Sequence, residues 1–227
     1  MTEPSAPSAG LSVAHLFWQP GPIVDRDGVL AIIEKAQSDG AQVVCAAMLG
    51  HKADLATMIL CEDQWAIRRF QTALVDAGLE LVDSYVSLTE LSEYSAGMPE
   101  EMRQARLFPQ LPPEGKPAFC FYPMSKRRER KANWFTLDFD ERKTLMHEHG
   151  TSGRKFAGRV IQVITGSTGL DDYEWGVTLF CQRPDDIKEI VYTMRFDEAS
   201  AVYADFGPFY VGMVAAPAEA LTEIGIV

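Results

Sequence analysis

The sequence predicts an α+β fold with antiparallel sheets, arranged as two units that each follow the order β-α-β-β-α-β. Strand-like apolar runs and amphipathic helical stretches alternate in this order twice along the chain. Hydrophobic residues make up 47% of the 227 residues, which is enough to bury a sizeable core. We expect a disordered lead at 1–10, an N-terminal unit at 11–89, a connector at 90–116 and a C-terminal unit at 117–227.

The N-terminal half supplies the first unit. Strands are expected where apolar residues run together, and helices where pairs such as Val29 and Ile33 or Phe70 and Leu74 recur at helical spacing. In chain order, the elements are a strand at Leu11–Trp18, a helix at Asp25–Ala36, strands at Ala41–Met48 and Leu55–Cys61, a helix at Asp63–Ala77 and a strand at Leu79–Leu88. This order is the split unit of ferredoxin-like folds.

The C-terminal half repeats this ferredoxin-like topology without repeating the sequence. The helix expected at 138–149 has acidic Asp138 and Asp140 at its start and Gly150 as its stop. The other expected elements are strands at 118–122, 160–166, 174–181 and 206–213, a helix at 185–194 and a further helical region near 195–204. The Pro- and Gly-rich connector contains a short helical segment near 98–107.

The charge and cysteine content exclude several classes of function. A formal charge of −11 and a pI near 4.8 argue against nucleic-acid binding, because phosphate contacts require a basic surface. No apolar run reaches the ~18 residues of a membrane span, and the start MTEPSAPSAG lacks the features of a signal peptide. The four cysteines show no CxxC spacing, which indicates buried, reduced thiols in a cytoplasmic protein.

Two histidines, His147 and His149, lie in the helix expected at 138–149. Residues two apart are separated by about 200° around a helix, so both cannot bind one ion. His149 shares its face with Leu145 and is the inward residue, whereas His147 points to water or a neighbour. One histidine cannot hold zinc well, but it suffices as an axial ligand of haem. Spacing alone leaves open both an axial ligand and a core histidine.

A concentrated positive charge is unusual in this acidic chain. Five cationic residues follow the strand expected at 118–122: Lys126, Arg127, Arg128, Arg130 and Lys131. A solvated loop is one interpretation, and a pocket that supplies paired donors to carboxylates is the other. Arg195 could serve such a pocket or pair with Asp197 or Glu198. The sequence has no Gly-rich phosphate loop, Ser-His-Asp order or HExxH motif, so those enzyme classes are not supported.

Several separated motifs resemble the coproheme decarboxylases, the haem-synthesis branch of the chlorite dismutase superfamily. They are YPMSK at 122–126, NW at 133–134, LMHEHG at 145–150, GSTGLDDYEWGVTLF at 166–180 and MRFDEASAVYADFGPFYVG at 194–212. The match runs through nearly all of residues 80–213, whereas the N-terminal half matches mainly in topology. The resemblance implies two ferredoxin-like units per chain in a dimeric α+β barrel, assembled as a homopentamer.

The resemblance also implies a reaction. Iron coproporphyrin III (coproheme) is both substrate and redox cofactor, and hydrogen peroxide is the oxidant. Two propionates leave as carbon dioxide, which gives the vinyl groups of haem b. A ferrochelatase is the implied supplier of coproheme. The four propionates of coproheme require several cationic or hydroxyl donors, which offers a role for the positive charge of this chain.

The resemblance assigns the central site residues motif by motif. His149 aligns with the proximal iron ligand, and Tyr122 aligns with the tyrosine that, as a radical, abstracts hydrogen from a propionate. Lys126 and Met124 lie in the same motif as Tyr122, and Lys126 would hold a reacting propionate. Trp134 matches a tryptophan near the second reactive propionate.

Further positions are implied around the porphyrin. Arg195 and Ser200 match propionate-binding positions, and Arg154 matches a further propionate partner. Arg106 resembles an arginine of the distal connector. Gln162 matches a distal glutamine, which makes it the candidate for handling peroxide.

The chain departs from the family in two places. No histidine occurs in 90–116, where some relatives carry a distal histidine. Phe135 replaces the tyrosine of an NWY motif, which leaves Tyr122 as the natural radical carrier. Two other functions stay open: a chlorite dismutase, which would rely on a distal arginine such as Arg106, and a haem carrier or sensor without turnover.

Overall fold

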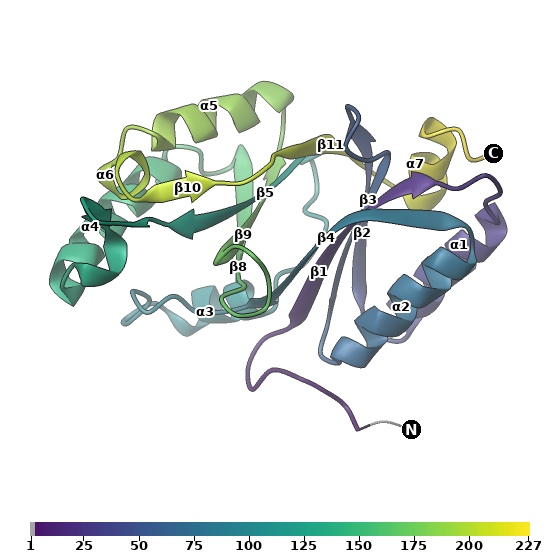
Figure 1. The fold of residues 1–227 in the computed structure, drawn as a ribbon, viewed down its shortest axis with the longest axis horizontal. Coiled ribbons are helices and arrows are strands. Elements are labelled where there is room, and N and C mark those ends of the chain that lie inside the picture. The colour runs from purple at the N-terminus through teal and green to yellow at the C-terminus, as the bar shows by residue number, and fades with distance from the viewer. Residues whose placement is uncertain (1–2) are drawn as a thin grey trace.

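A closed ring of antiparallel strands forms the centre of the computed structural model, which describes residues 3–227 (Figure 1). The ring runs β5-β11-β2-β3-β1-β4-β8-β9 and closes because β9 also pairs with β5. Its strands are β1 (Ser12–Pro20), β2 (Gln42–Leu49), β3 (Leu55–Cys61), β4 (Leu79–Thr89), β5 (Ala118–Lys126), β8 (Val160–Gly166), β9 (Trp175–Cys181) and β11 (Tyr210–Ala215). β10 (Ala204–Phe206) pairs with the far end of β5, and β6 (Arg128–Glu129) and β7 (Ala132–Asn133) form a separate small hairpin.

Each half of the ring has the strand order of a ferredoxin-like unit. The orders are β4-β1-β3-β2 and β11-β5-β9-β8, so the last strand of each unit lies beside its first strand. One seam between the units pairs β11 with β2, and the other pairs Leu88 and Thr89 of β4 with the end of β8. The two sheets are therefore continuous, and the predicted α+β barrel of two ferredoxin-like units is confirmed.

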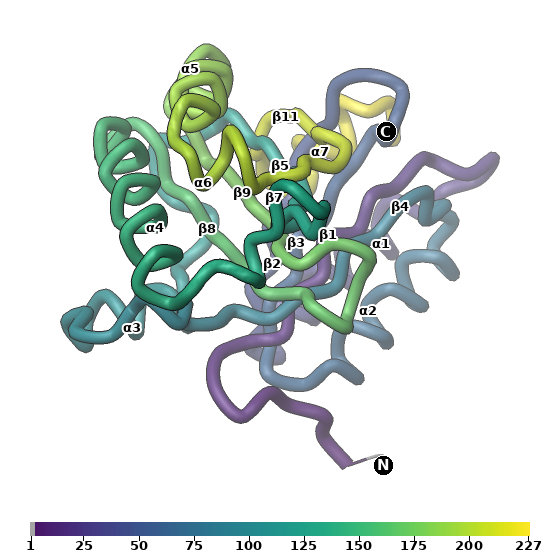
Figure 2. Tube along the Cα trace, turned by 60° about the vertical axis from the view of Figure 1, so that its left-hand side comes forward, coloured from purple at the N-terminus to yellow at the C-terminus, as the bar shows by residue number. Residues whose placement is uncertain are grey.

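Helices cover the outside of the ring on two sides. They are α1 (Arg26–Ser38), α2 (Gln64–Asp76), α3 (Glu100–Leu107), α4 (Phe139–Arg154), α5 (Pro184–Met194), α6 (Glu198–Ala201) and α7 (Pro217–Glu223), with a 3₁₀ turn η1 at Trp134–Thr136. Figure 2 shows α4, α5 and α6 grouped on the side of β8 and β9, whereas α1 and α2 lie on the opposite side. Each unit therefore has its own layer of helices.

Alternation along the strands divides the side chains between the inside and the outside of the ring. Phe17, Phe121 and Phe180 belong to the inner cluster, and Leu179 of β9 packs outward against Ile190 of α5. His15 is buried inside the ring, and its imidazole stacks on Phe121 with ring centroids 4.1 Å apart. Burial lowers the pKa of His15 to about 3, which keeps this imidazole neutral.

Three predictions about element boundaries were wrong. Gly150 does not end its helix, because α4 continues to Arg154; a helical glycine costs only about 1 kcal/mol, and the Thr151 hydroxyl donates to the His147 carbonyl within the helix. The strand expected at 206–213 is divided into β10 and β11, since Pro208 has no N–H to continue the ladder. The helical region near 195–204 is only the single turn α6, and α7 was not predicted.

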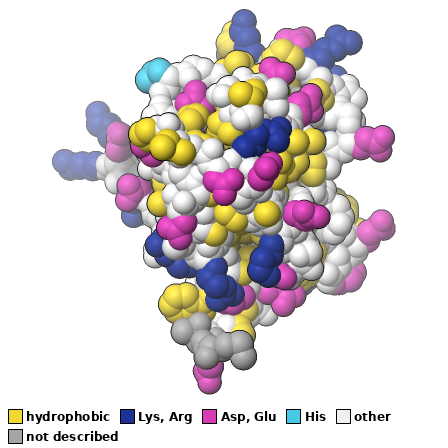
Figure 3. All heavy atoms as spheres, turned by 90° about the vertical axis from the view of Figure 1, so that its right-hand side faces the viewer, with side chains coloured by type: hydrophobic (Ala, Val, Ile, Leu, Met, Phe, Trp, Pro, Cys, Tyr) yellow, Lys and Arg dark blue, Asp and Glu magenta, His cyan; other side chains and the backbone are white. Residues whose placement is uncertain are grey.

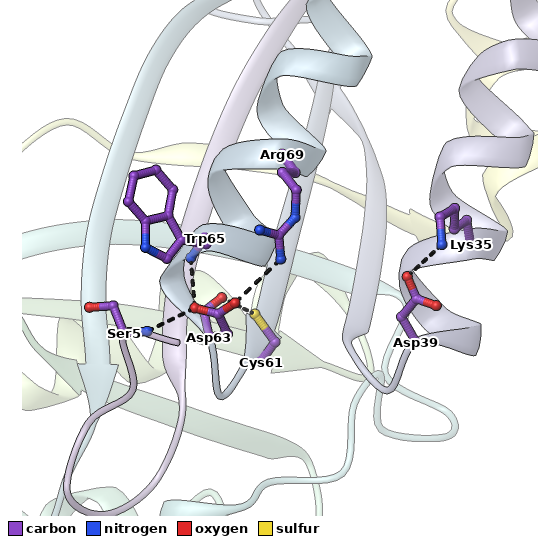
Figure 4. Close-up of polar contacts among 7 residues, drawn as sticks. All are labelled: Ser5, Lys35, Asp39, Cys61, Asp63, Trp65 and Arg69. Carbon is purple, nitrogen blue, oxygen red and sulfur yellow. Dashed lines mark hydrogen bonds and ion pairs between the residues drawn. The ribbon is translucent and has the colours of Figure 1, made fainter. Parts of the chain in front are cut away.

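The lead expected at 1–10 lies partly outside the described residues, and 3–10 form no helix or strand. Within it, the backbone N–H of Ser5 donates to Oδ1 of Asp63, which also accepts from the N–H of Trp65 and caps α2 (Figure 4). These hydrogen bonds hold the pKa of Asp63 below its usual range. The Lys35–Asp39 pair in the same view is solvent-exposed at the end of α1, so it contributes little to stability.

The surface of the N-terminal unit carries charges of both signs. Figure 3 shows acidic and basic side chains interspersed with small apolar patches on this face.

Between residues 3 and 227, no helix has the length and apolar character needed to cross a membrane. Within the same range all four cysteines are free and buried, as the sequence indicated, and burial raises the pKa of Cys45 to about 12.

Candidate functional site

A row of side chains crosses the outer face of the C-terminal sheet. Ile164 of β8 pairs with Val177 of β9, which in turn pairs with Tyr122 of β5. Residues paired across strands point to the same face, so these three side chains share it. Ile164 is 46% exposed although it lies within a strand, whereas Val177 and Tyr122 are buried. Part of this sheet face is therefore left open and apolar.

Three more predicted site residues share this face. Met124 and Lys126 follow Tyr122 at two-residue steps along β5, and Gln162 precedes Ile164 by two residues on β8. A step of two residues along a strand returns to the same face. Met124 and Gln162 are half-buried, and Lys126 is buried. The structure therefore brings Tyr122, Met124, Lys126 and Gln162 to one side of the sheet.

Tyr122 lies in an aromatic environment. Its ring stacks on Phe209 with centroids 4.5 Å apart and lies tilted against Phe206 at 5.7 Å. Burial raises the pKa of Tyr122, with a further contribution from Cys120, and the nearby Arg195 charge only partly opposes this. The phenol therefore keeps its proton at neutral pH, and oxidation of this ring must remove a proton together with the electron.

The imidazole of His149 is bound to a carboxylate through its Nδ1 atom. Its Nδ1 lies 3.0 Å from Oδ1 of Asp197 and 3.3 Å from Oγ of Ser200. Asp197 is the N-cap of α6 and also accepts from the N–H of Ser200. Burial raises the pKa of Asp197, but the hydrogen bond and charge of His149 and the Ser200 bonds outweigh it, so the net shift is downward. A proton on Nδ1 leaves the Nε2 lone pair free to bind a metal.

The exposure of the two α4 histidines matches their expected faces. The His149 side chain is 22% exposed, and His147 is exposed on a different face of the helix. Of the two, only His149 has a buried carboxylate behind it, since the Asp197 side chain is 5% exposed. The geometry therefore favours His149 as the ligand of the pair.

Lys126 connects the sheet to α6. Its Nζ donates to the Ala199 carbonyl at 2.6 Å and lies 4.2 Å from the ring centroid of the buried Trp134. Its backbone N–H donates to Oε2 of Glu174 at 2.8 Å. Burial lowers the pKa of Lys126 to about 8, although the charges of Asp197 and Glu174 raise it in part. This ammonium is therefore turned into the protein, beside the residues that hold His149.

Arg195 lies at the C-terminal end of α5. Its guanidinium stands over the Phe206 ring at 5.3 Å. It also borders an open, shallow groove of about 260 Å³ that Phe209 lines as well. The alternative pairing is not found in the described part of the chain: neither Asp197 nor Glu198 forms an ion pair with Arg195, and the Asp197 carboxylate is bound to His149 and Ser200. Arg195 thus places a positive charge next to the aromatic pair around Tyr122.

Other predicted residues lie apart from this group. Arg154 is exposed in the last turn of α4, where it donates to the Thr151 hydroxyl at 2.6 Å. Arg106 is exposed in the last turn of α3. Of the cationic run, Arg127 pairs with Asp205, and its other members beyond Lys126 are exposed around the β6–β7 hairpin.

Sequence reasoning missed Asp197, Glu174 and Phe209. Asp197 has a local signal, since an aspartate before EASA is a typical helix N-cap, but that signal predicts a cap and not a histidine partner. Glu174 and Phe209 have no such signal, because they contact residues of β5 that are distant in the sequence.

The donor set fits a haem-type metal and not a metal held by protein alone. Among residues 3–227, no group of three or more His, Cys, Asp or Glu side chains could hold a metal ion. A porphyrin supplies four nitrogens itself and requires only an axial ligand from the protein. One imidazole with a free Nε2 and a hydrogen-bonded Nδ1 meets that requirement.

Known proteins resemble this chain in sequence and architecture. The chlorite dismutase family model matches residues 26–215. The coproheme decarboxylase of Staphylococcus carnosus is 48% identical over 177 residues, which are 73% of this chain and 70% of the relative. A candidate heme-binding protein of Natronomonas pharaonis is 44% identical over 202 residues; the match covers 82% of this chain but only about a third (33%) of that longer relative.

Solved structures agree. A heme-binding protein from Thermus thermophilus superposes with a TM-score of 0.83 and 33% identity, covering 99% of this chain and 100% of the other. Chlorite dismutase of Candidatus Nitrospira defluvii, in complex with imidazole, superposes with a TM-score of 0.76 over 96% of both chains, and at 19% identity it shows the fold alone. The matched residues, the identities and the barrel together show that this chain belongs to the chlorite dismutase family.

Proposed function

We propose that this protein is an enzyme that binds iron coproporphyrin III through His149 and, with hydrogen peroxide, converts two propionates to vinyl groups, giving haem b. The observation that carries the proposal is the pairing of one oriented imidazole with one oxidisable phenol. His149 is held by Asp197 on α6, and α6 is tied through Ala199 to Lys126, four residues after Tyr122 on β5. The named coproheme decarboxylase, at 48% identity, supports the same reaction.

The chemistry gives each propionate loss a fixed stoichiometry. One propionate, one hydrogen peroxide and one proton become one vinyl group, one carbon dioxide and two waters. The bound iron porphyrin, with peroxide, supplies the oxidising power. Tyr122, whose phenol is kept neutral by burial, would lose an electron and a proton together. It would then take a hydrogen atom from the propionate carbon that is bonded to the porphyrin ring.

The remaining site residues would bind the substrate. Arg195 and Ser200 are proposed to meet propionates, with Lys126 and Trp134 near a reacting one. Met124 and Gln162 lie on the same sheet face, where Gln162 would contact peroxide. Arg154 and Arg106, which are exposed, are proposed contacts that require the bound substrate. A cytoplasmic homopentamer supplied with coproheme by a ferrochelatase completes the proposal.

Mass spectrometry of the porphyrin tests this function. Peroxide added stepwise to the coproheme complex should produce a three-propionate intermediate and then haem b, through two successive losses of carbon dioxide. Peroxide consumption without any change in porphyrin mass would contradict the proposal and favour a carrier or sensor. Rapid, sustained oxygen release from chlorite at an oxygen electrode would favour a chlorite dismutase instead.

Replacement of the ligand tests the binding mode. His149→Ala should alter the Soret band of the complex, and added imidazole should restore it by occupying the vacated axial position. His147→Ala is the matched control, because His147 is exposed two residues earlier on the same helix. An unchanged Soret band in His149→Ala would remove His149 as the ligand.

A further inference from the structure

The carboxyl group of Glu90 lies directly on the sheet. A Cβ atom added to Gly166 would lie 2.3–2.4 Å from three atoms of the Glu90 carboxyl group, so this group fills the space that any side chain at 166 would need. The indole Nε1 of Trp175 donates to Oε1 of Glu90 at 3.3 Å. Glu90 follows the end of β4 at its seam with β8, which directs its side chain across the seam.

The register shows which face of the sheet this carboxyl group occupies. Gly166 pairs with Trp175, which pairs with Met124, and this row lies next to the row of Ile164 and Tyr122. Gly166 is two residues beyond Ile164 on β8, which is a distance of about 7 Å along the strand. The Glu90 carboxyl group is therefore on the same open, apolar face as the phenol of Tyr122.

The surroundings of this carboxyl group are poor in compensating charge. Glu90 as a whole is solvent-exposed, but partial burial of its carboxyl group against the sheet raises its pKa, and the hydrogen bond from the indole of Trp175 opposes this shift. The carboxylate of Glu174 on β9 is already bound to the Lys126 N–H, and Glu93 in the following loop is paired with Arg142. Within residues 3–227, no Lys, Arg or His forms an ion pair with Glu90. In the same range, its carboxyl group accepts one hydrogen bond, and the donor is the neutral indole of Trp175.

A tetra-anionic porphyrin on this face would bring negative charge toward an unpaired carboxylate. We propose that Glu90 takes up one proton from water when such a porphyrin covers the face, and that the resulting carboxylic acid donates a hydrogen bond to a propionate. This inference rests on the proposed function, since it assumes a porphyrin on the Tyr122 face. One O–H bond forms on a Glu90 carboxylate oxygen, and one bond to hydrogen breaks in the buffer acid that supplies the proton through the solvent.

Proton uptake makes porphyrin affinity depend on pH. If the complex binds one more proton than the free protein, the Kd rises with pH by up to tenfold per unit, between the pKa of Glu90 in the free protein and its higher pKa in the complex. In Glu90→Gln the amide donates a hydrogen bond without titrating. The Kd of Glu90→Gln should therefore not rise with pH through Glu90. At the alkaline end of the range, this variant should bind the porphyrin with a lower Kd than the wild type.

Titration calorimetry with metal-free coproporphyrin III tests the inference, because this porphyrin binds without redox chemistry. Runs at one pH in two buffers of different ionisation heat give the number of protons taken up. We expect the wild-type protein to take up about one proton more than Glu90→Gln. Glu34→Gln on α1 removes the same charge from an exposed position of the other unit, and it should behave as the wild type.

The possible outcomes distinguish a failure of the Glu90 inference from a failure of the proposed enzyme function. Equal proton uptake in the wild type and Glu90→Gln, with the same dependence of Kd on pH, would overturn the role of Glu90 while leaving the porphyrin site in place. A failure of both proteins to bind coproporphyrin or coproheme at any pH would overturn the proposed function, and the inference with it.

Discussion

Both oxygens of the Asp197 carboxylate face one nitrogen of His149: Oδ1 lies 3.0 Å and Oδ2 3.1 Å from Nδ1. The imidazole is thereby fixed in orientation and in tautomer, with Nδ1 as the protonated nitrogen. A carboxylate in this position also raises the basicity of the ring toward a metal on Nε2. Because Asp197 is the N-cap of α6, the fold of this single turn and the orientation of the His149 imidazole are linked.

Asp197→Asn should weaken the binding of iron porphyrin by about 10- to 100-fold, because an amide cannot support the imidazole as a carboxylate does. Asparagine is as good an N-cap as aspartate, so α6 should be preserved. Soret titration measures the Kd, and the band position reports the axial ligand. Glu198→Gln removes the adjacent, exposed carboxylate and should leave both unchanged. Identical behaviour of the two variants would contradict the role of Asp197.

Lys126 should make stability depend on pH in the alkaline range. Burial lowers its pKa from 10.5 in the unfolded chain to about 8 in the fold, so between these values the unfolded state binds more protons. Unfolding free energy contributed by Lys126 therefore rises as pH increases from about 8 to 10.5, by up to about 3 kcal/mol.

Comparison with Lys126→Met isolates this contribution, because the buried thiols and phenols titrate in both proteins. The wild type should gain stability relative to Lys126→Met between pH 7.5 and 10.5, measured by urea unfolding at each pH. Lys131→Met, an exposed change in the same cationic run, should show no such gain. If the difference in unfolding free energy between the wild type and Lys126→Met stays constant across this pH range, the lowered pKa of Lys126 is refuted.

Tyr122→Phe should retain coproheme and lose product. The substitution keeps the ring that stacks on Phe209 and removes only the hydroxyl. We expect the Kd to stay within about threefold of the wild type, a change below about 0.7 kcal/mol, while haem b formation stops. Porphyrin mass after peroxide addition is the measurement. Tyr192→Phe, on the exposed side of α5, is the control, and full activity of Tyr122→Phe would exclude the radical role.

The sequence predicted most strands and helices because their signals are local. Alternation and helical spacing are readable within a dozen residues, as in β3 and α2. Closure of the ring is not local: one seam consists of the pairs Leu88–Gly166 and Thr89–Thr165, and nothing in either segment specifies the other. The barrel was therefore expected only through the resemblance, whereas the order within each unit came from the residues.

The candidate site was predictable to a similar extent. His149 and Tyr122 lie in distinctive motifs, and the helix geometry separated His149 from His147 before the structure did. The direction of Lys126 was not predictable, because its ammonium turns toward Ala199 and Trp134, which are remote in sequence. Glu90 gave no signal, since its place on the sheet depends on the missing side chain of Gly166.

Two glycines offer opposite predictions for stability. A Cβ on Gly176 would lie 2.8 Å from Tyr85 and 3.0 Å from Thr165 inside the closed ring, where neighbours cannot move freely. Gly176→Ala should therefore lower the unfolding free energy by about 1–3 kcal/mol. Gly153 lies in α4, and the nearest atom to its Cβ position would be the Met194 methyl at 3.9 Å, an ordinary contact.

Gly153→Ala should accordingly raise the unfolding free energy by up to about 1 kcal/mol, the difference in helix propensity between alanine and glycine. Denaturant unfolding of the two variants and the wild type measures both effects. If the m-values are equal, the midpoint should fall for Gly176→Ala and rise for Gly153→Ala. Stabilisation by Gly176→Ala would mean that the ring interior has room at this position, which is incompatible with the close packing of Tyr85, Phe121 and Thr165 around it.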